Sequence, residues 1–84
     1  MMNKRVKFAQ LDAVLEELGF RMLVVSGLHV NYRHPDLEKP IMLRLHKPRD
    51  YVPDFELAYV RHELEWQGII ESADFEEKLL AVAA

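Results

Sequence analysis

Cysteine is absent from this sequence of 84 residues, and glycine occurs only three times. Without cysteine the chain can form no disulfide framework, thiolate metal site or thiol nucleophile. This suits a reducing compartment, so we expect a cytoplasmic protein. Each glycine falls at the end of an expected element or in a turn, which excludes a glycine-rich loop that cradles phosphate. No apolar run approaches the roughly 18–20 residues of a membrane span, so we expect no membrane partner.

The four histidines lack the short spacing that is typical of metal ligands. The two nearest in sequence, His29 and His34, are an odd number of residues apart, so they should lie on opposite faces of a strand. We therefore expect neither a metal site nor a cofactor.

Charge is distributed unevenly along the chain, whose net charge is −3. Residues 1–49 contain nine Lys or Arg and five Asp or Glu, a balance of +4, whereas residues 50–84 contain two and nine, a balance of −7. This asymmetry predicts a basic face suited to a polyanion, or two solvated faces of opposite sign. Lys4, Arg5 and Lys7 precede the first expected helix, where either a phosphate ligand or a flexible tail would explain them.

Apolar residues recur at helical spacing in three segments of the chain. The first segment runs from about residue 8 to 18 and ends before Gly19, a typical helix stop. The second runs from about 54 to 67 and ends in the same way before Gly68. The third begins near Ser72, a favourable capping residue, and extends towards the C-terminus.

Three β-rich segments separate the first two helices: residues 20–25, 28–34 and 41–46. Ser26-Gly27 predicts a hairpin, in which glycine takes up a backbone conformation that other residues avoid. Leu28, Val30 and Tyr32 should lie on the buried face of the second strand. With both helices on that face, we expect these side chains to be buried: Leu11, Leu15, Leu18, Val30, Tyr32, Leu43, Leu57, Val60 and Leu64.

The second helix carries two apolar stripes, although a helix on a small sheet normally needs only one. Leu57, Val60 and Leu64 should face the sheet. The other stripe, here called the aromatic stripe, consists of Phe55, Tyr59, His62 and Trp66. Because monomers rarely expose large apolar patches, we expect Phe75 and Leu79 of the third helix to pack over Tyr59 and Trp66. A partner site on the exposed stripe is the alternative.

The expected fold is therefore α+β, in the order α-β-β-β-α with a short C-terminal helix at about residues 72–84. We expect one domain of residues 1–84, with a three-stranded antiparallel sheet and helices on one face. This is the layout of double-stranded-RNA-binding-like folds. The opposite face should be open and basic. Its polar side chains come from the second and third strands and the following loop: His29, Asn31, Arg33, Arg44, His46 and Lys47.

Several stretches of this pattern occur together in a known family. They are residues 15–20 (LEELGF), the turn at 27–29, residues 32–35 (YRHP), His46, and residues 52–70. Over roughly residues 4–70 the chain resembles the HicA family of small toxins, also called YcfA-like proteins. The resemblance implies a ribosome-independent mRNA interferase, neutralised by a HicB-type antitoxin. It maps the family's active-site histidine onto His29, with Leu28 in place of the family's hydroxyl residue.

The polar face also has the groups that metal-free RNA cleavage needs. That reaction requires a base for the 2′-OH, an acid for the leaving oxygen, and cations for the phosphorane. We assign proton transfer to His29, with His46 as second proton carrier, because histidine titrates near neutral pH. The RNA-binding candidates are Asn31, Arg33, Arg44 and Lys47. We expect His34 and His62 to be structural. The alternatives are a non-catalytic RNA-binding module, a protein-interaction domain, or a solvated sheet face.

Overall fold

Three strands and three helices follow one another in the predicted order. The computed structural model describes residues 5–83. Its elements are α1 (Phe8–Glu17), β1 (Arg21–Val24), β2 (His29–Arg33), β3 (Ile41–Arg44), α2 (Asp54–Trp66) and α3 (Ser72–Ala83). The strands form one antiparallel sheet in the order β1-β2-β3, which confirms the α+β prediction. No helix within residues 5–83 combines the length and apolarity needed to cross a membrane.

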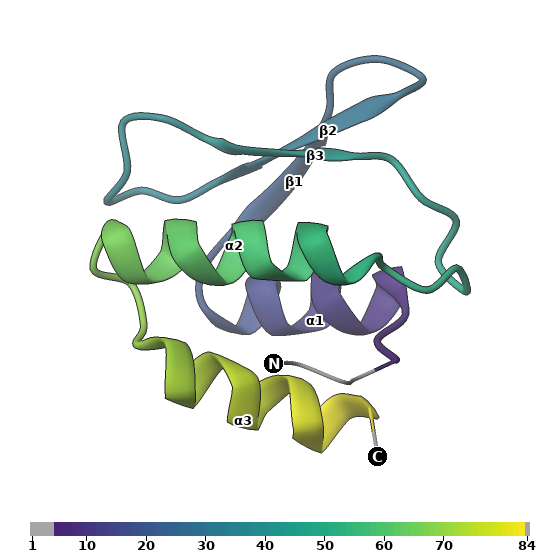
Figure 1. Ribbon diagram of the computed structural model, residues 1–84. Coiled ribbons are helices and arrows are strands. Elements are labelled where there is room, and N and C mark those ends of the chain that lie inside the picture. The colour runs from purple at the N-terminus through teal and green to yellow at the C-terminus, as the bar shows by residue number, and fades with distance from the viewer. Residues whose placement is uncertain (1–4, 84) are drawn as a thin grey trace.

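The helices all lie on one side of the sheet (Figure 1). Within this layer α1 packs near β1 and α2 near β3. The third helix packs against both α1 and α2, on their side away from the sheet (Figure 1). No helix of the described residues covers the other sheet face, here called the outer face.

Glycine ends both α1 and α2. Gly19 and Gly68 have φ angles of +100° and +77°, in the left-handed region that favours glycine. After each glycine, the next backbone N–H bonds back into the last helical turn: Phe20 donates to the Leu15 carbonyl and Ile69 to the Leu64 carbonyl. These bonds satisfy carbonyls that a helix end otherwise leaves open. The predicted helix stops are confirmed.

The core lies between the sheet and the helices, as the periodicity predicts. Of the nine side chains expected to be buried, eight are buried in the core. The exception is Leu18, which is half-buried because it is the last residue before the turn at Gly19. Further core side chains come from α1 and the chain entering it, from the residue before β1, from β3, from the loop before α2, and from α3: Val6, Phe8, Val14, Phe20, Ile41, Val52, Phe75 and Leu79.

The β1–β2 hairpin differs from its prediction in two ways. Gly27 is not among the glycines with positive φ, and a Cβ there would have no atom within 4 Å, so the turn does not require glycine. Leu28 was expected on the buried face but lies in the hairpin loop and is 73% exposed. Its carbonyl accepts a hydrogen bond from the Leu45 N–H, beyond the end of both strands. Alternation therefore fails at Leu28 because the pleated strand begins one residue later.

The predicted packing of α3 over the aromatic stripe is wrong. Phe75 and Leu79 are fully buried in the main core, whereas Tyr59 and Trp66 remain 42% and 78% exposed. Polar contacts hold α3 in place from both sides. The Gln10 side chain donates to the Val82 carbonyl at 2.7 Å, Lys78 pairs with Glu17, and Arg61 pairs with Glu76 at 3.3 Å. The α1–α2 layer leaves an apolar surface on its side away from the sheet, here called the underside. The third helix covers this underside and not the aromatic stripe.

Candidate functional site

Strand register brings four of the six predicted polar residues together on the outer face: His29, Asn31, Arg33 and Arg44. Arg21 pairs with Arg33 across β1 and β2, and His29 pairs with Arg44 across β2 and β3. Between these two pairs lies a row of Leu23, Asn31 and Met42. None of the seven strand side chains on this face is a carboxylate, and three are arginines. The face therefore carries positive charge at both ends of β2, about 13 Å apart along the strand.

His29 lies at the hairpin end of this face, with an exposed side chain. Its carbonyl accepts hydrogen bonds from the N–H groups of Val25 and Ser26, at 3.1 and 3.3 Å, which fix its backbone. No hydrogen bond to its imidazole occurs within residues 5–83, so both ring nitrogens are open to a ligand. A hydrogen-bonded backbone and an imidazole without a partner are suited to a residue that exchanges protons with a substrate.

A groove of about 400 Å³ begins beside His29, where β3 meets the first turns of α2. Its sheet side is formed by His29, Met42 and Arg44, and its helix side by Phe55 and Tyr59. Glu56 and Leu43 complete the lining. The sequence prediction identified the aromatic stripe but placed it under α3. Only the position of α2 along the β3 edge brings the first half of the stripe to His29.

His46 does not share the outer face, contrary to the prediction. β3 ends at Arg44, so the strand alternation does not extend to it. Its Nε2 lies 3.1 Å from each carboxylate oxygen of Glu56, and its ring packs 5.6 Å from that of Phe8. Glu56 is only 5% exposed, so this pair forms part of the contact between the loop and both helices. The geometry makes His46 a structural residue instead of a second proton carrier.

Lys47 follows His46 in a loop that turns towards α1. It is exposed, and its backbone N–H donates to the Asp50 carboxylate at 3.2 Å. The same loop occupies the N-terminus of α1, because the carbonyls of Asp50 and Pro48 accept from the N–H groups of Phe8 and Ala9. A phosphate therefore has no free helix N-terminus here.

The cations preceding α1 also contribute little to a phosphate site at this helix end. The Arg5 guanidinium stacks over the Tyr51 ring at 4.5 Å, a cation–π contact that accounts for its position. The backbone N–H of Lys7 donates to the Gln10 side chain at 2.8 Å, which caps the first turn of α1. Lys4 lies outside the described residues.

Asn31 lies at the centre of the outer face but is 9% exposed, because Leu23 and Met42 flank it. Its Oδ1 has no hydrogen-bond partner within the described residues. An unpaired buried amide oxygen costs free energy that a donor from a ligand would recover. Asn31 thus has the right chemistry for its predicted binding role, although its side chain is less accessible than expected.

His34 is structural, as predicted. Its Nε2 lies 3.0 Å from the Leu18 carbonyl, and its Nδ1 accepts from the Asp36 N–H at 3.1 Å. These partners require the neutral tautomer with the proton on Nε2. The ring also packs edge-on against Phe20 at 4.8 Å. His62, in contrast, is exposed and stacks on Trp66 at 6.4 Å within the aromatic stripe.

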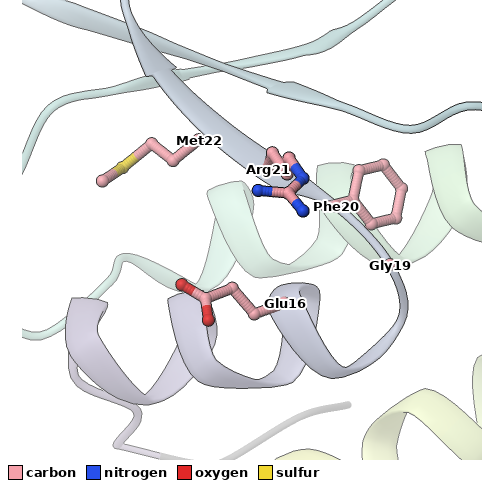
Figure 2. A pocket seen from close by; sticks show the side chains of 5 residues that line it. All are labelled: Glu16, Gly19, Phe20, Arg21 and Met22. Carbon is pink, nitrogen blue, oxygen red and sulfur yellow. The ribbon is translucent and has the colours of Figure 1, made fainter.

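A second pocket, of about 430 Å³, lies at the far end of the sheet from His29. It is lined by Glu16 and Gly19 at the end of α1 and by Phe20, Arg21 and Met22 entering β1 (Figure 2). Nearby, burial raises the pKa of Tyr32, and the hydrogen bond from its hydroxyl to Asp12 and the charge of Glu16 add to this. The carboxylates on this inner side make the pocket a poor site for a polyanion.

Comparison of the chain with family models, curated proteins and solved structures gives no match. No group of three or more His, Asp or Glu side chains within residues 5–83 is arranged to hold a metal ion.

Proposed function

We propose that the chain binds RNA on its outer face and cleaves it by a metal-independent reaction in which His29 transfers the proton. The observation that carries this proposal is the composition of the outer face. Three arginines and His29 point outward from three strands, with no carboxylate among them. Cations in this arrangement neutralise a phosphate backbone without reading its sequence.

The proposed reaction is an internal transesterification. The 2′-oxygen of a ribose attacks the adjacent phosphorus, the bond from phosphorus to the 5′-oxygen breaks, and a cyclic phosphate and a free 5′-hydroxyl result. His29 takes the proton from the 2′-hydroxyl and returns it to the leaving 5′-oxygen. Arg44, its cross-strand partner, stabilises the extra negative charge of the phosphorane. His29 acts in both proton steps because His46 is engaged by Glu56.

The resemblance to HicA toxins supports the same reaction class, and it supplies the proposed protein partner. A HicB-type antitoxin would stop cleavage by covering His29 and the outer face. The exposed position of His29 at the hairpin end is compatible with such a cover.

The test is a cleavage assay on end-labelled single-stranded RNA with a metal chelator present. We expect His29→Ala to lower the cleavage rate by about 10²–10⁴-fold, the usual contribution of a general acid–base group. His62→Ala is the matched control, because His62 is also an exposed histidine but lies on α2. Both variants should keep the wild-type unfolding midpoint, since neither removes buried packing.

Three results would overturn the assignment. His29→Ala protein that cleaves like wild type would remove His29 from the reaction, and cleavage that stops with the chelator would point to a metal. Wild-type protein that binds RNA in a salt-dependent way but never cleaves it would favour the alternative of a non-catalytic RNA-binding module.

A further inference from the structure

The groove beside His29 combines two kinds of side chain that nucleic acids contact separately. Arg44 presents positive charge from the sheet, and His29 lies beside it. Phe55 and Tyr59 line the groove from α2, and they remain 67% and 42% exposed. Aromatic rings are platforms on which unpaired bases stack, and basic side chains track the phosphates that connect those bases.

We infer that this groove holds one unpaired nucleobase of single-stranded RNA, stacked on Phe55 and Tyr59, while Arg44 contacts the neighbouring phosphate. The inference rests on the proposed function and names the form of RNA that the same site takes. A duplex keeps its bases paired and stacked inside the helix, so they cannot reach the groove. A single strand can turn a base outward at little cost.

The platform belongs to a helix that packs on the sheet before any ligand binds. Phe55 and Tyr59 lie on α2, which contacts β3, and Met42 of β3 lines the same groove. Glu56, the carboxylate that lines the groove, is buried and accepts its contacts from His46. Its charge is therefore directed into the protein and not towards an entering phosphate. Ordering the site in advance lowers the entropic cost of binding.

Charge restricts the binding surface to the first half of the aromatic stripe. Beyond Tyr59 the surface continues towards Trp66, but Asp36, Glu38 and Glu63 line it there, with Lys39 as the one cation among the lining residues. Three carboxylates around this half repel a phosphate backbone. Trp66 is even more exposed than Phe55 and is also an aromatic side chain, but it lies among these carboxylates, where RNA should not bind.

This contrast supplies a matched pair of variants, Phe55→Ala and Trp66→Ala. The probe is a fluorescently labelled single-stranded RNA with 2′-O-methyl riboses, which cannot be cleaved through the 2′-oxygen. Binding is measured by anisotropy against this strand and against the same strand annealed to its complement. We expect Phe55→Ala to weaken single-strand binding by about 5- to 150-fold, the effect of removing one stacked base contact. Binding of the duplex and the salt slope should stay at wild-type values, because no charge is removed.

Trp66→Ala should bind both probes like wild type, and Phe55→Trp should keep the single-strand affinity. The inference is wrong if the two alanine variants behave alike, or if Phe55→Ala weakens duplex binding equally. In either case RNA binding and the role of His29 would stand. Wild-type protein that binds neither probe would overturn the inference and the proposed function together. Unfolding midpoints of all variants exclude misfolding as the cause.

Discussion

Truncating Phe75 tests which surface of the fold α3 covers. Phe75 is fully buried, so Phe75→Ala removes a ring from the core and leaves a cavity, at a cost of about 3–5 kcal/mol. Domains of this length have unfolding free energies of about 4–13 kcal/mol, so this change removes much of the total. Urea denaturation followed by circular dichroism should show a midpoint lower by at least about 1 M.

Trp66→Ala provides the comparison, because it tests the packing expected from the sequence. If α3 covered the aromatic stripe, both substitutions would break the same contact and cost similar amounts. With Trp66 mostly exposed, its removal should change the unfolding free energy by no more than about 0.5 kcal/mol. Equal losses for the two variants, or an unchanged midpoint for Phe75→Ala, would refute the observed packing.

Three further predictions concern pH, a buried hydrogen bond and salt. Tyr32→Phe removes the hydroxyl that donates to Asp12 at 2.8 Å and should cost about 0.5–1.5 kcal/mol in urea denaturation. Because burial raises the pKa of Tyr32, wild type should also lose stability as pH rises above the ordinary value of 10.0, and the Phe variant should lose less. Hydrogen bonds from Ser72 lower the pKa of Glu65. The stability that the Glu65 carboxylate contributes is therefore present above the ordinary pKa of 4.5 and is lost as pH falls further. Glu65→Gln should flatten the acid limb of the stability–pH curve. Arg33→Gln and Arg44→Gln should each reduce the salt slope of single-stranded RNA binding by about 0.7, measured by anisotropy from 50 to 200 mM salt.

Each of these measurements has a specific opposing result. A Tyr32→Phe variant with the same alkaline limb as wild type would show that the hydroxyl is not the group responsible. If Glu65→Gln leaves the acid limb unchanged, the contact between α2 and the start of α3 does not contribute to the pH dependence of stability. Arg61→Gln is the control for salt, since Arg61 pairs with Glu76 between α2 and α3, away from the outer face.

Local patterns predicted the elements of this fold well because they are decided by local chemistry. Helical periodicity and the stops at Gly19 and Gly68 depend on neighbouring residues, and the structure confirms them. Alternation identified the two faces of β2 from residue 29 onward. It failed at Leu28 because the start of pairing, and not apolar character, decides where a strand begins.

The position of α3 could not be predicted from amphipathicity. The apolar side chains Phe75 and Leu79 require a cover, but two unpartnered surfaces were available to them. One was the aromatic stripe and the other was the underside of the α1–α2 layer, which becomes apparent only when both helices are in place. Long-range packing chooses between such surfaces, and no spacing rule records that choice.

The candidate site was predicted only in part for the same reason. The register of three strands brings His29 and Arg44 together, and alternation was sufficient to foresee this. His46 follows the same alternation in the sequence, but β3 ends two residues before it and its imidazole contacts the Glu56 carboxylate. Phe55 and Tyr59 were visible as a stripe, yet their place beside His29 depends on how α2 crosses the edge of β3.

The environments of the histidines themselves support a role for His29. His34 has two hydrogen bonds and an aromatic contact, and His46 has a buried carboxylate, so the fold gives a reason for each. The His29 ring is exposed and makes no hydrogen bond within residues 5–83, although its backbone is fixed by the hairpin. Its side chain thus contributes little to stability, while its neighbours Arg44, Phe55 and Tyr59 line the groove for which we propose RNA binding. A residue whose side chain the fold does not use, placed at such a surface, is the one whose replacement should alter activity without altering stability.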